Sequence, residues 1–517
     1  MPRFKPYDYR QTVMLPIDFE QQILPGTFEY SVHYLVDNEL DLSLFNSRFT
    51  NDDTGRPAYD PAILLKIVLL AYSRGVTSSR KIEALCRENV IFMALSADSR
   101  PHFTTIAEFI SSSHEQIADL FHQVLMTCDS LGLIGKEMFA VDGCKMPSNA
   151  SKEWSGSKAD LKKKAKKIDK AVRFLLGKHR EEDKRGASDA KVRQREEQQK
   201  ETLRQASRKI KNFLAKNDDR LGRSGKVVQS NITDPDSAKM KTSHGVIQGY
   251  TGVAAVDSKH QVVVAAEAFG TGQEHGLLEP MLENVREAFN GDHFQEGDEL
   301  LREAQVLADS GYHSGETLDY LEDNQIDAYI ADNRFRARDP RFTTASRHKP
   351  EESAKPKDPK ALFTAQDFQA DIEKQTCICP AGKTMWLKSA RARIKRHEFM
   401  QFQGYQADCD SCALRLKCLR NPKPKAARQV HILLGAAKTK TGTTTPIERM
   451  KQKIDSALGR HLYGQRLGIV EPVFGNIRET LGLRRFSLRG KKKVDAQWKL
   501  MTMVHNIFKI HRYGWGL

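Results

Sequence analysis

Apolar side chains recur at helical spacing through residues 1–132. The segment Pro61–Tyr72 is almost entirely apolar and stops before Gly75, which predicts a buried helix with a glycine at its carboxyl end. Thr77–Ser79 predicts the start of a second helix, and a Thr105–Glu108 capping box predicts a third. We therefore expect an all-helical first domain. Short helices joined by tight turns are typical of a helix-turn-helix DNA reader and, equally, of a dimerisation module.

From residue 133 the pattern changes to short apolar runs that alternate with helical segments, which predicts an α/β domain over residues 133–335. Five of these runs predict strands: one ends at Asp142, one ends at Asp309, one is Ala328–Ala331, and Gly249–Asp257 and Gln261–Glu267 form a hairpin. Helical spacing returns after Pro446, so residues 441–517 are predicted to be the last, helical part of the same domain.

Two segments interrupt this α/β pattern. Residues 158–223 are highly charged, and their apolar residues are too sparse for a heptad repeat, which predicts a projecting helical hairpin that turns near Arg185–Ser188. Runs such as Lys162–Lys167 could hold phosphates, although a solvated helix face is the commoner meaning of such charge. Residues 336–440 are polar and Pro-rich and then contain cysteines, so we expect an insertion there.

Length and charge narrow the class of protein. The 517 residues suggest about three domains. Lys and Arg outnumber Asp and Glu by 82 to 66, and the net charge of +16 favours a polyanionic partner, although solubility alone could explain a modest surplus. The most apolar stretch, Ile63–Tyr72, is too short to cross a bilayer and contains Lys66. We therefore expect a cytoplasmic protein without a membrane anchor.

Five of the eight cysteines cluster within residues 377–418. In a reducing compartment such a cluster favours a metal over disulfides. The preferred zinc ligands are four of these thiols: Cys379, Cys409, Cys412 and Cys418. Reduced packing thiols are the alternative interpretation, and Cys86 and Cys128 are predicted to lie in the helical core.

Three carboxylates stand in settings that suit a site that cuts phosphodiesters. Asp142 and Asp309 each follow a predicted buried strand, and Glu471 lies beside the apolar stripe of a late helix. A lone buried carboxylate is costly, and a divalent cation is a suitable partner for it. Each residue also has an ordinary explanation: Asp with Gly can form a turn, and Glu before Pro472 can cap a helix start.

On these residues the chain resembles the bacterial insertion-sequence transposases of the DDE type. Their pattern has a first Asp at a strand end, a second before a Gly-Tyr stretch, and a Glu on a late helix. The signature around the Glu corresponds to Tyr463, Arg466, Glu471 and Arg478. The interval from Arg466 to Glu471 is one residue longer than in the commonest form, and Arg478 replaces the usual Lys.

The resemblance implies a ribonuclease-H-like mixed sheet flanked by helices, and two Mg²⁺ or Mn²⁺ ions held by the three carboxylates. It also implies double-stranded DNA, both element ends and target, as the substrate, and assembly into a homodimer or a higher oligomer. Tyr463, Arg466 and Arg478 would contact the DNA. Two alternatives remain, namely a structure-specific metal-dependent nuclease and a DNA-binding regulator without activity.

Four further residues are weaker candidates. Asp234 and Asp236 are expected to cap a turn rather than to act in catalysis, and His313 is expected on the surface. Cys144 would share the face of Asp142 if the strand continued, although packing is its simpler role.

Overall fold

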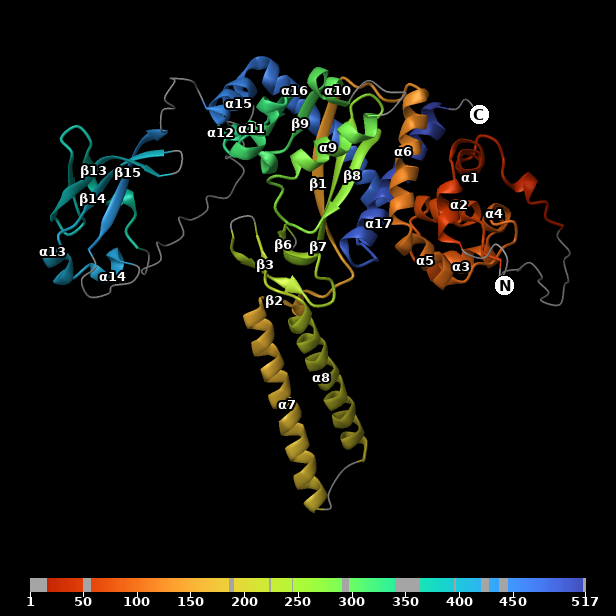
Figure 1. Ribbon diagram of the computed structural model, residues 1–517, viewed down its shortest axis with the longest axis horizontal. Coiled ribbons are helices and arrows are strands. Elements are labelled where there is room, and N and C mark those ends of the chain that lie inside the picture. The colour runs from red at the N-terminus through yellow and green to blue at the C-terminus, as the bar shows by residue number, and fades with distance from the viewer. Residues whose placement is uncertain are drawn as a thin grey trace, which may run out of the picture. The chain divides into compact units, whose positions relative to one another are not determined.

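A computed structural model describes residues 16–49, 57–185, 190–222, 225–243, 245–290, 297–339, 362–394, 397–419, 427–436 and 445–514. The chain divides into two compact units (Figure 1). The first consists of Met1–Asp332 together with Met450–Leu517, and the second of Asn333–Arg449. None of the helices within these described ranges is long and apolar enough to cross a membrane.

The first unit is organised around a mixed sheet. Strand β1 (Met138–Pro147) lies between β7 (Gly245–Asp257), which is antiparallel to it, and β9 (Gln305–Ala308), which is parallel. Strand β10 (Asp327–Ile330) continues the parallel side. On the far edge of β7, its first and second halves pair with β6 (Ala238–Thr242) and β8 (Val263–Phe269). The predicted mixed α/β fold is confirmed, and β7 with β8 forms the predicted hairpin.

Strand β1 does not end at Asp142, as the sequence suggested. It continues to Pro147, and Asp142 pairs with Ala254 in the middle of the ladder. The turn interpretation of Asp142–Gly143 is therefore wrong. Gly143 has another role, because a Cβ at this position would lie 2.9 Å from the Thr251 side chain. The glycine thus allows close packing inside the sheet.

Helices surround the sheet. In the first unit they are α9 (Leu278–Phe289), α10 (Gly297–Glu303), α11 (Gly315–Asp323), α16 (Ala457–Gly475) and α17 (Lys491–Lys509), and α15 (Pro446–Asp455) spans the boundary with the second unit. Glu471 and Pro472 both lie inside α16, in its last turns. The interpretation of Glu471 as the cap of a helix start is therefore wrong.

The N-terminal region is helical, as predicted. Its α-helices are α1 (Phe28–Tyr34), α2 (Pro61–Ser73), α3 (Ser79–Glu88), α4 (Val90–Leu95), α5 (Phe103–Ser112) and α6 (His114–Ser130). Gly75 takes a φ of 73° just after α2, as expected for a helix-ending glycine. The Thr105–Glu108 capping box is wrong. Helix α5 begins two residues earlier with His102 as its cap, and α6 is a separate helix.

Helix α17 joins the N-terminal helices to the sheet. It packs against β8 as well as against α2, α5 and α6. The buried Trp498 donates a hydrogen bond to the Val253 carbonyl oxygen at 2.9 Å, and Asn506 exchanges two hydrogen bonds with the Val263 backbone. The Phe28 and Phe508 rings stack with centroids 4.0 Å apart. The helical region and the sheet therefore share one core rather than forming separate bodies.

The charged segment forms two long helices that lie side by side, α7 (Lys158–Arg185) and α8 (Ala190–Lys216) (Figure 1). Apolar side chains join them at the end nearest the sheet: Leu161, Ala165, Ile210 and Phe213 are buried, with Trp154 packed beside them. Short strands lie at this base: β2 (Ser155–Gly156), β3 (Arg220–Leu221), β4 (Val227–Val228) and β5 (Ser230–Asn231). The predicted turn at residues 186–188 falls outside the described residues.

The second unit contains an antiparallel sheet that the sequence analysis did not predict. Its strands, in spatial order, are β11 (Gln369–Asp371), β12 (Thr376–Ile378), β13 (Thr384–Ile394), β14 (His397–Gln403) and β15 (Gln429–Ala436). Short helices accompany them: α12 (Phe335–Arg338), α13 (Gln406–Asp410) and α14 (Arg415–Cys418). Phe402 and Cys377 are fully buried in its core. The Pro-rich residues 340–361 lie outside the described residues.

Candidate active site

Asp142 and Asp309 are brought together by the pairing of two parallel strands. Val141 of β1 is in register with Ala308 of β9, so the next residue of each chain segment is an aspartate at the same level of the sheet. Arg466 of α16 contacts both. Its Nη1 lies 2.6 Å from Asp142 Oδ2, and its Nη2 lies 3.6 Å from Asp309 Oδ1. Asp142 and Asp309 thus share one guanidinium group, which belongs to a residue 324 positions after Asp142.

Tyr463 completes this contact from the preceding turn of α16. Its hydroxyl lies 3.5 Å from Asp309 Oδ1, and its ring centroid lies 5.8 Å from the Arg466 guanidinium carbon. In this structure Tyr463 and Arg466, both predicted to contact DNA, face the two aspartates.

Arg466 and Asp142 form a largely buried ion pair, and this burial affects the pKa of Asp142. The Arg466 side chain is only 8% exposed and that of Asp142 21%. Burial raises the pKa of Asp142, even though Arg466 and the Gly143 N–H both favour the ionised form. A further positive charge nearby would therefore stabilise the ionised form of Asp142.

Glu274 is a third carboxylate at this place, and the sequence analysis missed it. It lies between β8 and α9, and burial first, then the charges of Asp142 and Asp309, raise its pKa. Lys145 opposes this shift from 3.7 Å. A Cβ on Gly311 would lie 2.1 Å from Glu274 Oε2, so the glutamate packs tightly against the turn after Asp309. Glu274 lies in a polar loop, and the sequence pattern there did not indicate a functional site.

The hydroxyl of Tyr312 lies near the carboxylates of Asp142, Glu274 and Asp309. Tyr312 is fully buried, and its hydroxyl has no hydrogen-bond partner within the described part of the chain. Burial and the charges of Asp142, Glu274 and Asp309 raise its pKa well above the usual range. The hydroxyl therefore remains protonated, and it is a free donor beside three carboxylates.

Glu471 is not in contact with this group. Its side chain is exposed, and no hydrogen bond or ion pair joins it to Asp142 or Asp309 among the described residues. It follows Arg466 by five positions on the same helix, which turns it roughly 140° away around the axis. Its role as a metal ligand stays a prediction.

Arg478 lies in a pocket next to the carboxylates. The other charged residues of this pocket are Lys145, Lys241, Arg484 and Glu274, and we call it the basic pocket. Cys144 also lines it, since β1 continues past Asp142. Burial raises the pKa of Cys144 to about 12, although the Arg478 charge opposes the shift. Cys144 is therefore an un-ionised thiol.

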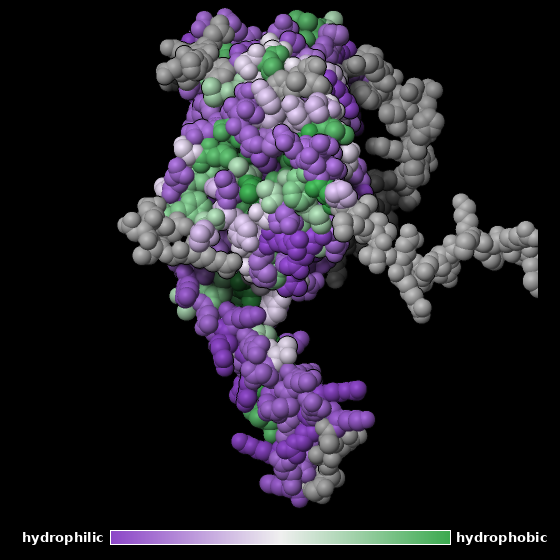
Figure 2. Space-filling model, turned by 90° about the vertical axis from the view of Figure 1, so that its right-hand side faces the viewer, coloured by the Kyte–Doolittle hydropathy of each residue, from purple (hydrophilic) through white to green (hydrophobic). Residues whose placement is uncertain are grey.

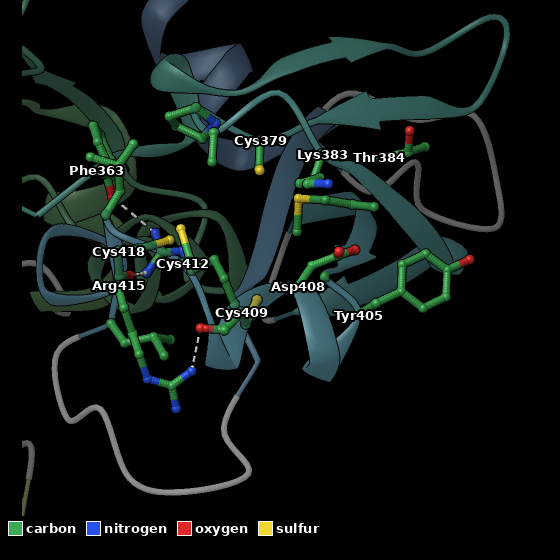
Figure 3. Close-up of a pocket in the computed structure, with 17 residues that line it drawn as sticks. Phe363, Cys379, Lys383, Thr384, Tyr405, Asp408, Cys409, Cys412, Arg415 and Cys418 are labelled. Atoms are coloured by element: carbon green, nitrogen blue, oxygen red, sulfur yellow. Dashed lines mark hydrogen bonds between the residues drawn. The ribbon is translucent and has the colours of Figure 1, made fainter.

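In the second unit, Cys379, Cys409, Cys412 and Cys418 line one pocket (Figure 3). Burial and the three other thiols raise the pKa of Cys418. As arranged in the described ranges, no group of three or more His, Cys, Asp or Glu side chains could hold a metal ion. The structure thus gathers the four predicted ligands without showing a finished metal site.

The weaker candidates Asp234 and Asp236 make structural hydrogen bonds. Asp234 accepts hydrogen bonds from the Tyr250 hydroxyl at 2.6 Å and the Gly490 N–H at 3.1 Å, and Asp236 accepts from the Lys491 N–H at 2.9 Å. Both aspartates thus hold the start of α17. His313 is half-buried rather than on the surface, and burial lowers its pKa.

Comparison with known families found two matches. A family model described as a transposase DDE domain matches residues 378–511, and one described as a transposase domain (DUF772) matches residues 17–112. These two segments are similar to transposase domains. The first match includes the segment from Tyr463 to Arg478 and the cysteine pocket, and the second includes most of the N-terminal helices. Comparisons with curated proteins and with solved structures found no match.

Similarity to the DDE transposases has three implications. A DDE transposase is an enzyme that cleaves nucleic acid, so its partner is DNA. A DDE catalytic domain implies a ribonuclease-H-like fold. The sheet observed here is mixed and six-stranded: β8-β7-β1-β9-β10 lie in this order, and β6 also pairs with β7. DDE transposases generally use divalent metal ions.

Proposed function

We propose that this transposase cuts the ends of an insertion sequence and joins them to target DNA at one site built on Asp142 and Asp309. The observation that supports this most is the ion pair of Arg466 with both aspartates. Two carboxylates on neighbouring strands share one cationic group, and such a pair can also hold metal ions. Glu471 is proposed as the third ligand because of its place in the matched DDE segment.

The residues present fit hard divalent cations. All the donors are carboxylate oxygens, which Mg²⁺ and Mn²⁺ prefer. The raised pKa of Asp142 and the unpartnered Tyr312 hydroxyl indicate a buried polar site whose groups are not fully satisfied. When bound, two such ions would activate the attacking oxygen and stabilise the leaving 3′ oxygen.

The chain's own residues would orient the DNA. Lys145, Lys241, Arg478 and Arg484 in the basic pocket would hold the phosphates of the strand next to the carboxylates. The Tyr312 hydroxyl, which stays protonated, would donate a hydrogen bond to an oxygen at the reacting phosphate. Arg466 would keep Asp142 ionised when no other cation is present. No covalent protein intermediate is needed, because water attacks first and the freed 3′-hydroxyl attacks second.

We also propose roles for the parts of the chain. Residues 1–132 would bind DNA or mediate assembly, residues 133–335 and 441–517 would form the catalytic domain, and residues 336–440 would be an insertion. Because two element ends must be joined together, the active form would be at least a homodimer.

A strand-transfer assay tests the proposed function. The protein is incubated with Mg²⁺, a labelled duplex that contains the element's end, and a supercoiled target plasmid. We expect a nicked 3′ end followed by a product in which that end is joined to the plasmid. Cleavage without joining would favour the structure-specific nuclease. Binding without cleavage would favour the regulator.

We further propose that Cys379, Cys409, Cys412 and Cys418 hold a structural Zn²⁺. Four thiols in one pocket are a suitable donor set for zinc. Metal analysis after dialysis should find about one zinc per chain, which follows from one four-thiol site. Cys412→Ser should lose most of it, whereas Cys144→Ser, outside this pocket, should keep it. Wild-type protein without zinc would support packing thiols.

A further inference from the structure

The positive charge of this chain is concentrated in one part of the α7–α8 hairpin. Residues 158–173 and 203–216, the halves of the two helices that lie at the base, contain 13 Lys and Arg but only two Asp. This basic half therefore has a net charge of +11, out of +16 for the whole chain. Residues 174–202, toward the hairpin's far end, contain eight Lys and Arg and seven acidic residues, so they are nearly neutral.

The two halves also differ in how their charges are paired. In the distal half, Lys178 and His179 contact Glu196, Lys200 contacts Glu197, and Arg193 contacts Asp183. In the basic half, Asp169 is neutralised by Lys211 at 2.8 Å and accepts a hydrogen bond from Ser207. Lys158 also pairs with Asp218 at 2.6 Å. Most cations of the basic half thus keep their charge available to a partner.

A groove between the two helices gathers these cations. Arg173 of α7 and Arg204, Arg208 and Lys211 of α8 line it together with Asp169. The three arginines are exposed, and none of them forms a salt bridge within the described residues. Lys162, Lys166 and Lys170 add an exposed row one helical turn apart on α7.

The apolar side chains of the basic half point the other way. Leu161, Ala165, Ile210 and Phe213 are buried between the helices, so they cannot enter a lipid surface or an apolar protein groove. Figure 2 shows that the surface of this projection is predominantly hydrophilic. A strongly cationic surface whose large apolar side chains are mostly buried fits the phosphate backbone of a nucleic acid duplex. Phe174, which is 72% exposed, lies just beyond this surface on α7.

We propose that the basic half of the α7–α8 hairpin binds the phosphate backbone of double-stranded DNA, outside the carboxylate site. The inference rests on the proposed function, in which the chain acts on DNA. The contacts would go to phosphates and not to base edges, so they would hold DNA of any sequence. In this arrangement the hairpin adds affinity for duplex flanking the cleaved bond, while the basic pocket holds the reacting strand.

The test compares two matched triple variants. Arg173→Gln, Arg204→Gln and Arg208→Gln together remove the groove cations. Arg180→Gln, Lys184→Gln and Arg195→Gln together remove three exposed cations of the distal half. Thermal unfolding is first measured to check that both variants are folded. Affinity for a short fluorescent duplex of random sequence is then measured by anisotropy over a range of KCl concentrations, with EDTA present so that no cleavage occurs.

For the groove variant, the slope of log affinity against log salt should become shallower by about 0.9 for each phosphate that the protein no longer neutralises, or about 2.7 for three. The distal variant should keep the wild-type slope. Equal slopes for wild type and both variants would overturn the inference, since the charge would then only solvate the hairpin. An equal decrease of the slope in both variants would overturn it too. The proposed function is judged separately by cleavage of wild-type protein with Mg²⁺, which this binding measurement does not require.

Discussion

Asp309→Asn is expected to abolish metal-dependent DNA cleavage while DNA binding is largely retained. The amide has the same shape but no negative charge, so it cannot neutralise a divalent cation. Removal of one ligand from such a site takes away several kcal/mol of transition-state stabilisation. We expect cleavage to slow by at least about a hundredfold, which corresponds to roughly 3 kcal/mol. The rate is measured with labelled duplex in Mg²⁺, and binding is measured in EDTA.

The control is Asp323→Asn, an exposed aspartate at the end of α11 that should leave both quantities unchanged. Cleavage at the wild-type rate by Asp309→Asn would remove this residue from the site. The same assay decides the third ligand. Glu471→Gln should slow cleavage as strongly as Asp309→Asn if Glu471 reaches the metal. If Glu274→Gln has the large effect instead, then the glutamate beside the aspartates is the ligand.

Arg466→Met is expected to destabilise the first unit by about 3 kcal/mol, because it leaves two partly buried carboxylates without their shared counter-charge. Arg466→Lys keeps a positive charge but not the forked contact, so it should be destabilised less. The free energy of unfolding is measured by urea titration near neutral pH. An unchanged free energy of unfolding in Arg466→Met would show that the ion pair contributes nothing to stability.

Two further measurements identify the cause of this destabilisation. Burial already raises the pKa of Asp142, and removal of Arg466 would raise it further. A carboxyl whose pKa is higher in the folded state contributes stability below its unfolded pKa and loses it as pH rises. The deficit of Arg466→Met should therefore shrink as the pH is lowered toward about 4, near the unfolded pKa of Asp. Mg²⁺ should also stabilise this variant if the carboxylates hold metal.

Local patterns predicted several elements of this protein well. The apolar run at Pro61–Tyr72, followed by Gly75, has the features of a helix and its end, and the structure shows both. The apolar run at Gly249–Asp257 predicted a strand of the observed hairpin. These features depend on neighbouring residues, so the sequence contains the information directly. The capping box at Thr105 failed because the helix already begins at Phe103, where the His102 side chain accepts a hydrogen bond from the Thr104 N–H.

The candidate site likewise has some features that the sequence predicted and others that only the tertiary structure decided. The strand before Asp142, the Gly-Tyr stretch after Asp309 and the spacing from Tyr463 to Arg478 indicated a DDE transposase from sequence alone. The basic charge agreed with this prediction, and the cysteine cluster separately indicated a zinc site. Tertiary structure alone decided that Arg466 contacts both aspartates, that Glu274 and Tyr312 lie beside them, and that Glu471 does not contact them. Such contacts depend on strand register and helix rotation between segments hundreds of residues apart. A charged loop residue such as Glu274 has the same local pattern whether it faces solvent or a buried carboxylate.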